Sequence, residues 1–136
     1  MILFHSSDLI WATKIKGTAE AAGLAARPVR TLEMLEARLA DSDVSAVVVD
    51  LEAPEVALAL IRRLRPADRE AREHAIRVLA FGPHVATDQF ELARRAGADH
   101  GVARGTFNAR MSSILSDLAT PSLRPPASGG SAEATG

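Results

Sequence analysis

The chain has 136 residues, and 47% of them are hydrophobic, which suits one globular domain with a buried core. Its 16 basic and 17 acidic residues nearly balance, which argues against a general affinity for nucleic acid or an anionic membrane. It has no cysteine, hence neither a disulfide framework nor thiolate chemistry, and no apolar run near the roughly 20 residues of a membrane span, so we expect a cytoplasmic protein.

The first part of the chain predicts two strand–helix units. Residues 1–5 (MILFH) form a short apolar run that suits a buried strand, and they lack the basic start of a signal peptide. Any of the three polar residues that follow can cap a helix over 9–22, which Gly23 ends. The weak strand at 24–30 contains a proline and is therefore expected at an edge of the sheet, before a second helix that starts at Thr31.

The middle of the chain contains the clearest strand. Residues 46–51 (AVVVDL) are apolar and β-branched, as expected for a strand buried on both faces of a sheet, and Asp50 ends the run. A helix is predicted over 54–66, with a proline in its first turn. The charged stretch 67–75 is a loop or an extension of that helix. The arginines of 62–72 have no aromatic residue among them, which indicates a solvated helix and loop rather than a nucleic-acid contact.

The last part of the chain repeats the alternation and then changes in composition. The predicted elements are a strand over 76–82, a helix over 86–98 closed by Gly97, a short strand over 100–104 and an amphipathic helix over 106–119. Residues 120–136 are rich in proline, glycine and serine, so we expect a disordered tail after a single domain over 1–119.

Five strands that alternate with five helices predict an α/β fold. The expected architecture is a five-stranded parallel sheet in the flavodoxin-like order 2-1-3-4-5, with helices on both faces. In such folds the functional groups gather at the carboxyl ends of the strands. The residues found there are Ser6, Ser7, Asp50, Gly82 and Arg104.

The segment RVLAFGPHVATDQFELARRAGADHGVARGTF, residues 77–107, resembles part of the receiver domain of two-component response regulators, the CheY-like family. It is similar to the stretch from the fourth strand to the turn after the fifth, including the Gly97-Ala98 pair. VVVDL is similar to the third strand of that family and places Asp50 at the phosphoacceptor position. The resemblance covers residues 1–119.

The resemblance also implies a set of groups that this chain lacks. The family holds Mg²⁺ with two acids after the first strand, where this chain has Ser6 and Ser7. Its phosphoryl-binding hydroxyl falls on Gly82, and its lysine falls on Arg104. A carboxylate that takes up a phosphoryl group needs cations to neutralise the charge. We therefore expect a degenerate receiver with no catalytic residue, no metal and no cofactor.

The expected function is a non-catalytic signalling or protein-interaction module that works without phosphorylation. An internal Asp50–Arg104 pair, joined through the planar guanidinium fork, is expected to fix one conformation. The resemblance implies that a protein partner or a second copy docks on the face formed by 86–98, 100–104 and 106–119. The candidate contact residues on that face are Phe90, Val102, Phe107 and Met111.

Three alternatives remain open from the sequence. The first is an atypical phosphoacceptor that uses Asp50. The second is a sensor of a small anion, seated in the space between Ser7, Gly82 and Arg104. The third is a hydrolytic enzyme, rated last because the sequence has no cysteine and no serine with an adjacent histidine motif. Separately, His5, Asp8, Asp50 and His84 are candidate ligands of a metal site, a weak signal.

Overall fold

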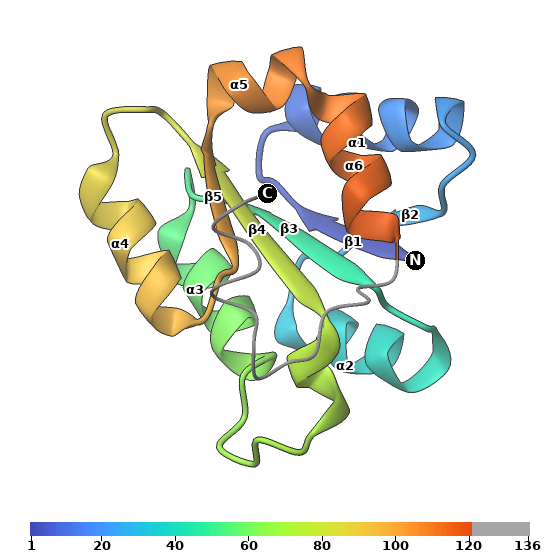
Figure 1. Ribbon diagram of the computed structural model, residues 1–136, viewed down its shortest axis with the longest axis vertical. Coiled ribbons are helices and arrows are strands. Elements are labelled where there is room, and N and C mark those ends of the chain that lie inside the picture. Colours follow the sequence, from blue (N-terminus) through green and yellow to red (C-terminus); the bar gives the residue numbers. More distant parts are fainter. Residues whose placement is uncertain (121–136) are drawn as a thin grey trace.

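Strands and helices alternate along the chain in a computed structural model, which describes residues 1–120 (Figure 1). The strands are β1 (Ile2–His5), β2 (Ala26–Pro28), β3 (Ala46–Asp50), β4 (Arg77–Gly82) and β5 (His100–Ala103). The helices are α1 (Leu9–Ala21), α2 (Leu32–Asp41), α3 (Pro54–Arg63), the 3₁₀ turn η1 (Arg72–Ala75), α4 (Thr87–Ala96), α5 (Arg104–Ala109) and α6 (Met111–Ala119). All of the tail predicted over 120–136 except Thr120 lies outside the described residues.

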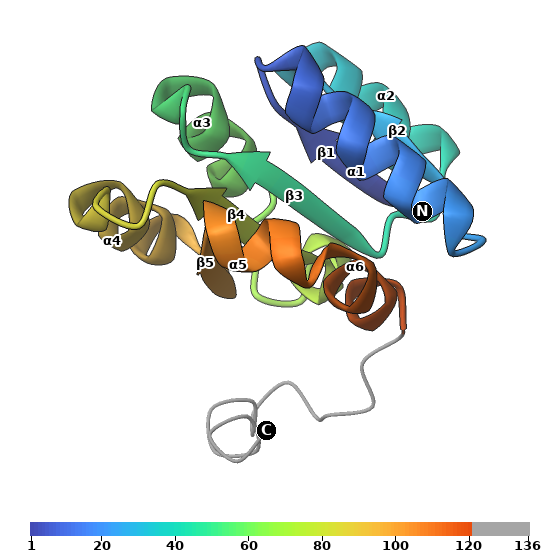
Figure 2. The ribbon, with the colours of Figure 1, turned by 90° about the horizontal axis from the view of Figure 1, so that it is seen from above.

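The five strands form one parallel sheet in the order β2-β1-β3-β4-β5, which confirms the predicted topology. The central strand β3 is buried along its whole length. Helices cover both faces of the sheet, as Figure 2 shows. One apolar cluster packs α2, α3 and α4 on one face, and a second packs α1, α5 and α6 on the other.

Several helix ends follow the predicted capping chemistry. The side chain of Asp8 accepts a hydrogen bond from the backbone N–H of Ile10 at 2.9 Å, and Thr31 does the same for Met34 at 3.1 Å. Gly23 and Gly97 follow α1 and α4 with φ angles of 76° and 122°, a region that glycine enters without strain.

The prediction of one helix over 106–119 is wrong. Helix α5 already begins at Arg104, and the backbone breaks at Arg110, where φ is −120° and ψ is 22°. No proline or glycine marks this break in the sequence. The two short helices bury both Phe107 and Met111 against the sheet, so tertiary packing overrides the local helical pattern here.

Arg65 ties together the loop that follows α3 and the amino-terminal ends of β4 and β5. Its guanidinium donates to the backbone carbonyls of Gly97, Leu64, Glu73 and Ile76, and to the Asp99 carboxylate at 2.9 Å. A planar group with five donors suits such a set of acceptors. The charged stretch 67–75 is therefore an anchored loop containing η1, not an extension of α3.

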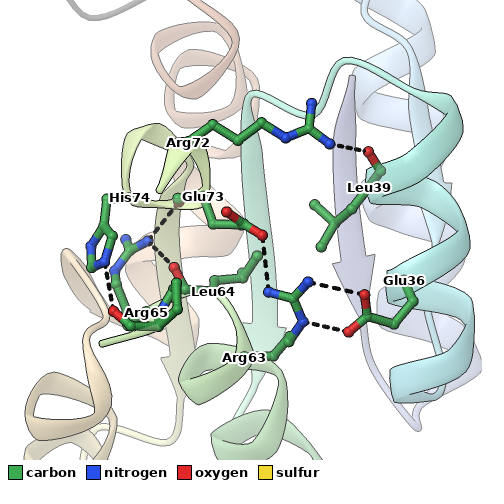
Figure 3. Close-up of polar contacts among 9 residues, drawn as sticks. Glu36, Leu39, Arg63, Leu64, Arg65, Arg72, Glu73 and His74 are labelled. Atoms are coloured by element: carbon green, nitrogen blue, oxygen red, sulfur yellow. Dashed lines mark hydrogen bonds and ion pairs between the residues drawn. The ribbon is translucent and has the colours of Figure 1, made fainter. Parts of the chain in front are cut away.

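Two neighbouring arginines are also used inside the fold (Figure 3). Arg63 binds both Glu36 of α2 and Glu73, and Arg72 donates to the backbone carbonyl of Leu39 at 2.7 Å. The hydrogen bond from Arg63 lowers the pKa of Glu36 below its ordinary value. Arg63, Arg65 and Arg72 of the arginine-rich stretch 62–72 therefore bind partners within the fold.

Within residues 1–120, no helix combines the length and the apolar character needed to cross a membrane.

Gly97→Ala is expected to lower the free energy of unfolding by about 2–3 kcal/mol. A methyl group there requires an unfavourable φ and overlaps the Cγ atom of Arg65, which displaces the guanidinium from its acceptors. Urea unfolding followed by circular dichroism measures the loss.

Gly17→Ala is the matched control, because Gly17 lies in α1 and no atom from elsewhere in the fold comes within 4 Å of the position that a methyl group would take. It should raise stability by about 0.5–1 kcal/mol through helix propensity alone. Equal effects of the two substitutions would contradict the role assigned to Arg65 and Gly97.

Candidate functional site

Asp50 ends β3 and is almost fully buried, with 1% of its surface exposed. One carboxylate oxygen, Oδ2, accepts a hydrogen bond from the hydroxyl of Ser6 at 2.8 Å. The other, Oδ1, accepts one from the backbone N–H of Glu52 at 2.9 Å. Internal donors therefore bind both oxygens, as burial of a charged group requires.

Arg104 starts α5 and lies beside this carboxylate, but it does not form the expected two-pronged pair with it. Its Nη2 atom is 3.8 Å from Oδ1 of Asp50, whereas it donates to Oε1 of Glu52 at 2.7 Å. Glu52 lies in the turn after β3 and is exposed, so it pairs with a cation at little cost of desolvation. The sequence-based prediction missed Glu52, although its place two residues after a strand-terminal aspartate was visible.

An aromatic cluster backs the guanidinium of Arg104. The Trp11 ring of α1 lies 5.8 Å from the Arg104 Cζ atom, within the range of a cation–π contact. Trp11 also packs on Phe81 of β4 and Phe107 of α5, with ring centroids 5.1 and 6.0 Å away. Arg104 is thus held between an aromatic face and a carboxylate, which restricts its position.

Among the described residues, no hydrogen bond joins the Asp50 carboxylate to the other two predicted pocket residues, Ser7 and Gly82. Ser7 is exposed, and the hydroxyl bound to the carboxylate is that of Ser6. Gly82 ends β4, where an added Cβ atom would lie 3.2 Å from Cβ of Leu51 and 3.8 Å from Cζ of Phe90. The space beside Gly82 is therefore already filled by neighbouring side chains.

The candidate metal ligands do not gather. Side chains alternate between the two faces along a strand, so His5 lies on the face of Leu3, and Asp50 lies on the opposite face with Val48. His5 donates from Nδ1 to the carbonyl of Val29 at 3.0 Å. Across residues 1–120, no group of three or more histidine, aspartate or glutamate side chains is placed to hold a metal ion.

The site does not fit the Mg²⁺ ion that the predicted resemblance would imply. Mg²⁺ in proteins uses one or two carboxylates together with waters. Here both oxygens of Asp50 accept hydrogen bonds from the protein, Arg104 lies beside it, and the Asp8 carboxylate caps α1. A fixed cation already balances the one buried carboxylate among the described residues.

Two of the four candidate interface residues belong to the core. Phe107 and Met111 are buried, with 0% and 3% of their surfaces exposed, because α5 and α6 pack them against the sheet. Phe90 and Val102 are half-buried, and Leu92 of α4 is 42% exposed. Of these five residues, only Phe90, Val102 and Leu92 can contribute to an outer surface.

Comparison with known proteins bears on the fold. No family model matches the chain, and no curated protein matches it significantly. The chain is similar to the solved receiver domain of a response regulator from Bermanella marisrubri, with 18% identity and a TM-score of 0.70 over 88% of this chain and 97% of that one.

Two further solved structures are similar to the same extent. A response regulator from Thermotoga maritima has 18% identity and a TM-score of 0.68 over 86% of this chain and 94% of that one. A response regulator receiver protein from Burkholderia phymatum has 18% identity and a TM-score of 0.67 over 86% and 92%. The structural neighbours are thus CheY-like receiver domains, and the chain has their fold.

Asp50→Ala is expected to lower the free energy of unfolding by about 1–3 kcal/mol, because it leaves the Ser6 hydroxyl and the Glu52 amide without their acceptor. The decrease is measured by urea unfolding at neutral pH. Asp50→Asn keeps one acceptor oxygen and should lose less. If Asp50→Ala is as stable as the wild type or more stable, the hydrogen bonds from Ser6 and Glu52 to the Asp50 carboxylate do not stabilise the fold.

Proposed function

We propose that this chain is a signalling module of the receiver type that binds another protein without control by phosphorylation. The observation that supports it best is the placement of Arg104 beside Asp50, between Glu52 and the Trp11 ring. Receiver-type folds in the structural neighbours come from response regulators, which favours a signalling role. The module is proposed to be non-catalytic.

The electrostatics of the site support the absence of phosphorylation. A carboxylate attacks a phosphoryl group only if nearby cations neutralise the combined negative charge. Ser6 brings no charge, and Ser7 is exposed, so neither replaces an acid that would hold a divalent ion. Arg104 is committed to Glu52, and its own position at the start of α5 keeps it close to the surface.

A permanent internal cation is also expected to remove the two-state behaviour of a switch. A ligand shifts a conformational equilibrium only through a difference in its affinity for the two states. Since Arg104 is part of the chain, its interaction with Glu52 and Trp11 needs no ligand and favours one arrangement of α5. The partner surface would then be constantly available.

The proposed partner surface is the face formed by α4, β5 and the α5–α6 segment. Its half-buried or exposed apolar residues are Phe90, Leu92 and Val102. A protein partner or a second copy of the chain is the expected occupant, and near-neutral net charge gives no support to nucleic acid.

An atypical phosphoacceptor is the second candidate function, and Glu52 is the observation that favours it. Glu52 adds a second carboxylate next to Asp50, on the exposed side of the site. Its present partner is Arg104, which would have to leave. The third candidate, a sensor of small anions, loses support because Leu51 and Phe90 lie against Gly82.

Incubation of the full chain with acetyl phosphate and Mg²⁺ should leave its intact mass unchanged. The reason is that a divalent ion at this site needs a second acid beside Asp50, and no other acid is buried among the described residues. In addition, Arg104 is engaged by Glu52. Mass spectrometry at several times after mixing provides the measurement, with an active receiver domain as the positive control.

Two variants decide how the result is interpreted. Asp50→Asn removes the only proposed acceptor and must behave as the wild type does. Glu52→Gln weakens the ion pair with Arg104 and is also expected to give no phosphorylated product. A Mg²⁺-dependent phosphoryl adduct in the wild type that is absent from Asp50→Asn would replace the proposal with the phosphoacceptor function.

A further inference from the structure

Strand β5 forms one edge of the sheet, and half of its backbone hydrogen-bonding groups face outward. Among residues 1–120, β5 pairs only with β4. On β4, the N–H of Arg77 donates to the carbonyl of Ser45, just before β3, and the carbonyl of Phe81 accepts from the N–H of Leu51, just after β3. Backbone groups alternate in direction along a strand, so those of Ala80 point to β5. Ala80 is in register with Gly101. In a parallel ladder a residue bonds to the two residues that flank its partner, so the backbone groups of Ala80 bond to those of His100 and Val102.

The N–H and C=O of Gly101 and the N–H of Ala103 therefore point away from the sheet. Within the part of the chain that the structure describes, no strand lies on this side to receive them. Gly101 is exposed and Ala103 is half-buried, and both have little or no side chain to cover the edge. An open edge of this kind is a template for an added strand.

A groove of about 420 Å³ runs along this edge, between β5 and α4, which lie side by side (Figure 1). Phe90 of α4 contributes an apolar surface, and its ring lies directly against the strand. A Cβ atom on Gly101 would be only 2.9 Å from Cδ1 of Phe90, so glycine is what permits this approach. The groove thus offers backbone partners on one side and an apolar contact on the other.

The charges at the groove favour an acidic occupant. Arg94 and Arg95 of α4 both bind the single carboxylate of Glu91, with Arg94 making two hydrogen bonds and Arg95 one. The hydrogen bond from Arg94 lowers the pKa of Glu91 to about 2, so this carboxylate is charged at neutral pH. The nearby Asp99 is already paired with Arg65. Arg94 and Glu91 line the groove, and Arg95 lies outside its lining. The other acid of α4, Asp88, is in the first turn, at the far end of the helix, so two guanidinium groups sharing one carboxylate leave a surplus positive charge at the last turn of α4, beside the groove.

We infer that the groove between α4 and β5 binds an extended segment of a partner protein, which adds as a sixth strand along β5 and presents an acidic side chain to Arg94 or Arg95. This inference rests on the proposed interaction role and specifies how the partner is held. The backbone groups of Gly101 and Ala103 supply the hydrogen bonds, Phe90 contacts an apolar side chain of the segment, and the arginines select for acid.

The test uses short random peptides displayed on phage and selected for binding to the full chain. We expect enrichment of peptides that alternate β-branched and polar residues and contain aspartate or glutamate. Ala103→Pro is the decisive variant: φ of Ala103 is −65°, which proline adopts, and the substitution removes only an N–H that faces outward. It should weaken binding of the selected peptides by about tenfold or more.

Ala103→Ser keeps the N–H and is the matched control, expected to bind as the wild type does. N-methylation of the selected peptide gives a second test that leaves the protein unchanged. Methyl groups on alternate residues that face β5 should abolish binding, and those on the intervening residues should not. The inference is overturned if no displayed peptide binds the wild type, if Ala103→Pro binds equally well, or if both methylation sets have the same effect. Absence of phosphorylation would stand in each of these cases, so the two proposals fail separately.

Discussion

The carboxyl end of the sheet, where the candidate site lies, depends on where one guanidinium group is held. Arg104 donates to Glu52, lies beside the buried Asp50 and faces the ring of Trp11, so three side chains restrict it. The ion pair with Glu52 is partly exposed and contributes only about 0.2–1 kcal/mol by itself. Its importance is positional, because it places a permanent positive charge at the carboxyl ends of the strands, next to the one carboxylate buried among residues 1–120.

The opposite end of the sheet contains a second arginine centre with a different role. Arg65 binds four backbone carbonyls and Asp99, and it requires glycine at position 97. Most of its donors go to the backbone, so it stabilises loops rather than presenting charge. The two centres divide the fold into an anchored end and the end that contains the candidate site. Signalling behaviour is proposed to depend on the second, while the first keeps β4 and β5 in register for the edge described above.

Most of the fold could be predicted because the strands are apolar runs separated by clear capping residues. The buried run that ends at Asp50, the caps at Asp8 and Thr31, and the glycine after α4 all rely on local chemistry. The break at Arg110 could not be predicted, because burial of side chains from two short helices determines it. Glu52 was missed for a related reason. Which acid receives Arg104 depends on the geometry of the turn after β3, and Ser6 rather than Ser7 reaches Asp50 because of how the chain leaves β1.

The tryptophan beside Arg104 gives the most direct test of the central claim, since Trp11 is the only tryptophan of the chain. Its fluorescence is measured in the full chain during titration with Mg²⁺ and then with beryllofluoride, an analogue of the phosphoryl group. We expect neither the intensity nor the emission maximum to change, because Arg104 stays with Glu52 and Trp11. A saturable change that requires both reagents and is lost in Asp50→Asn would show that the internal cation gives way to a metal ion, and that this domain is a working switch.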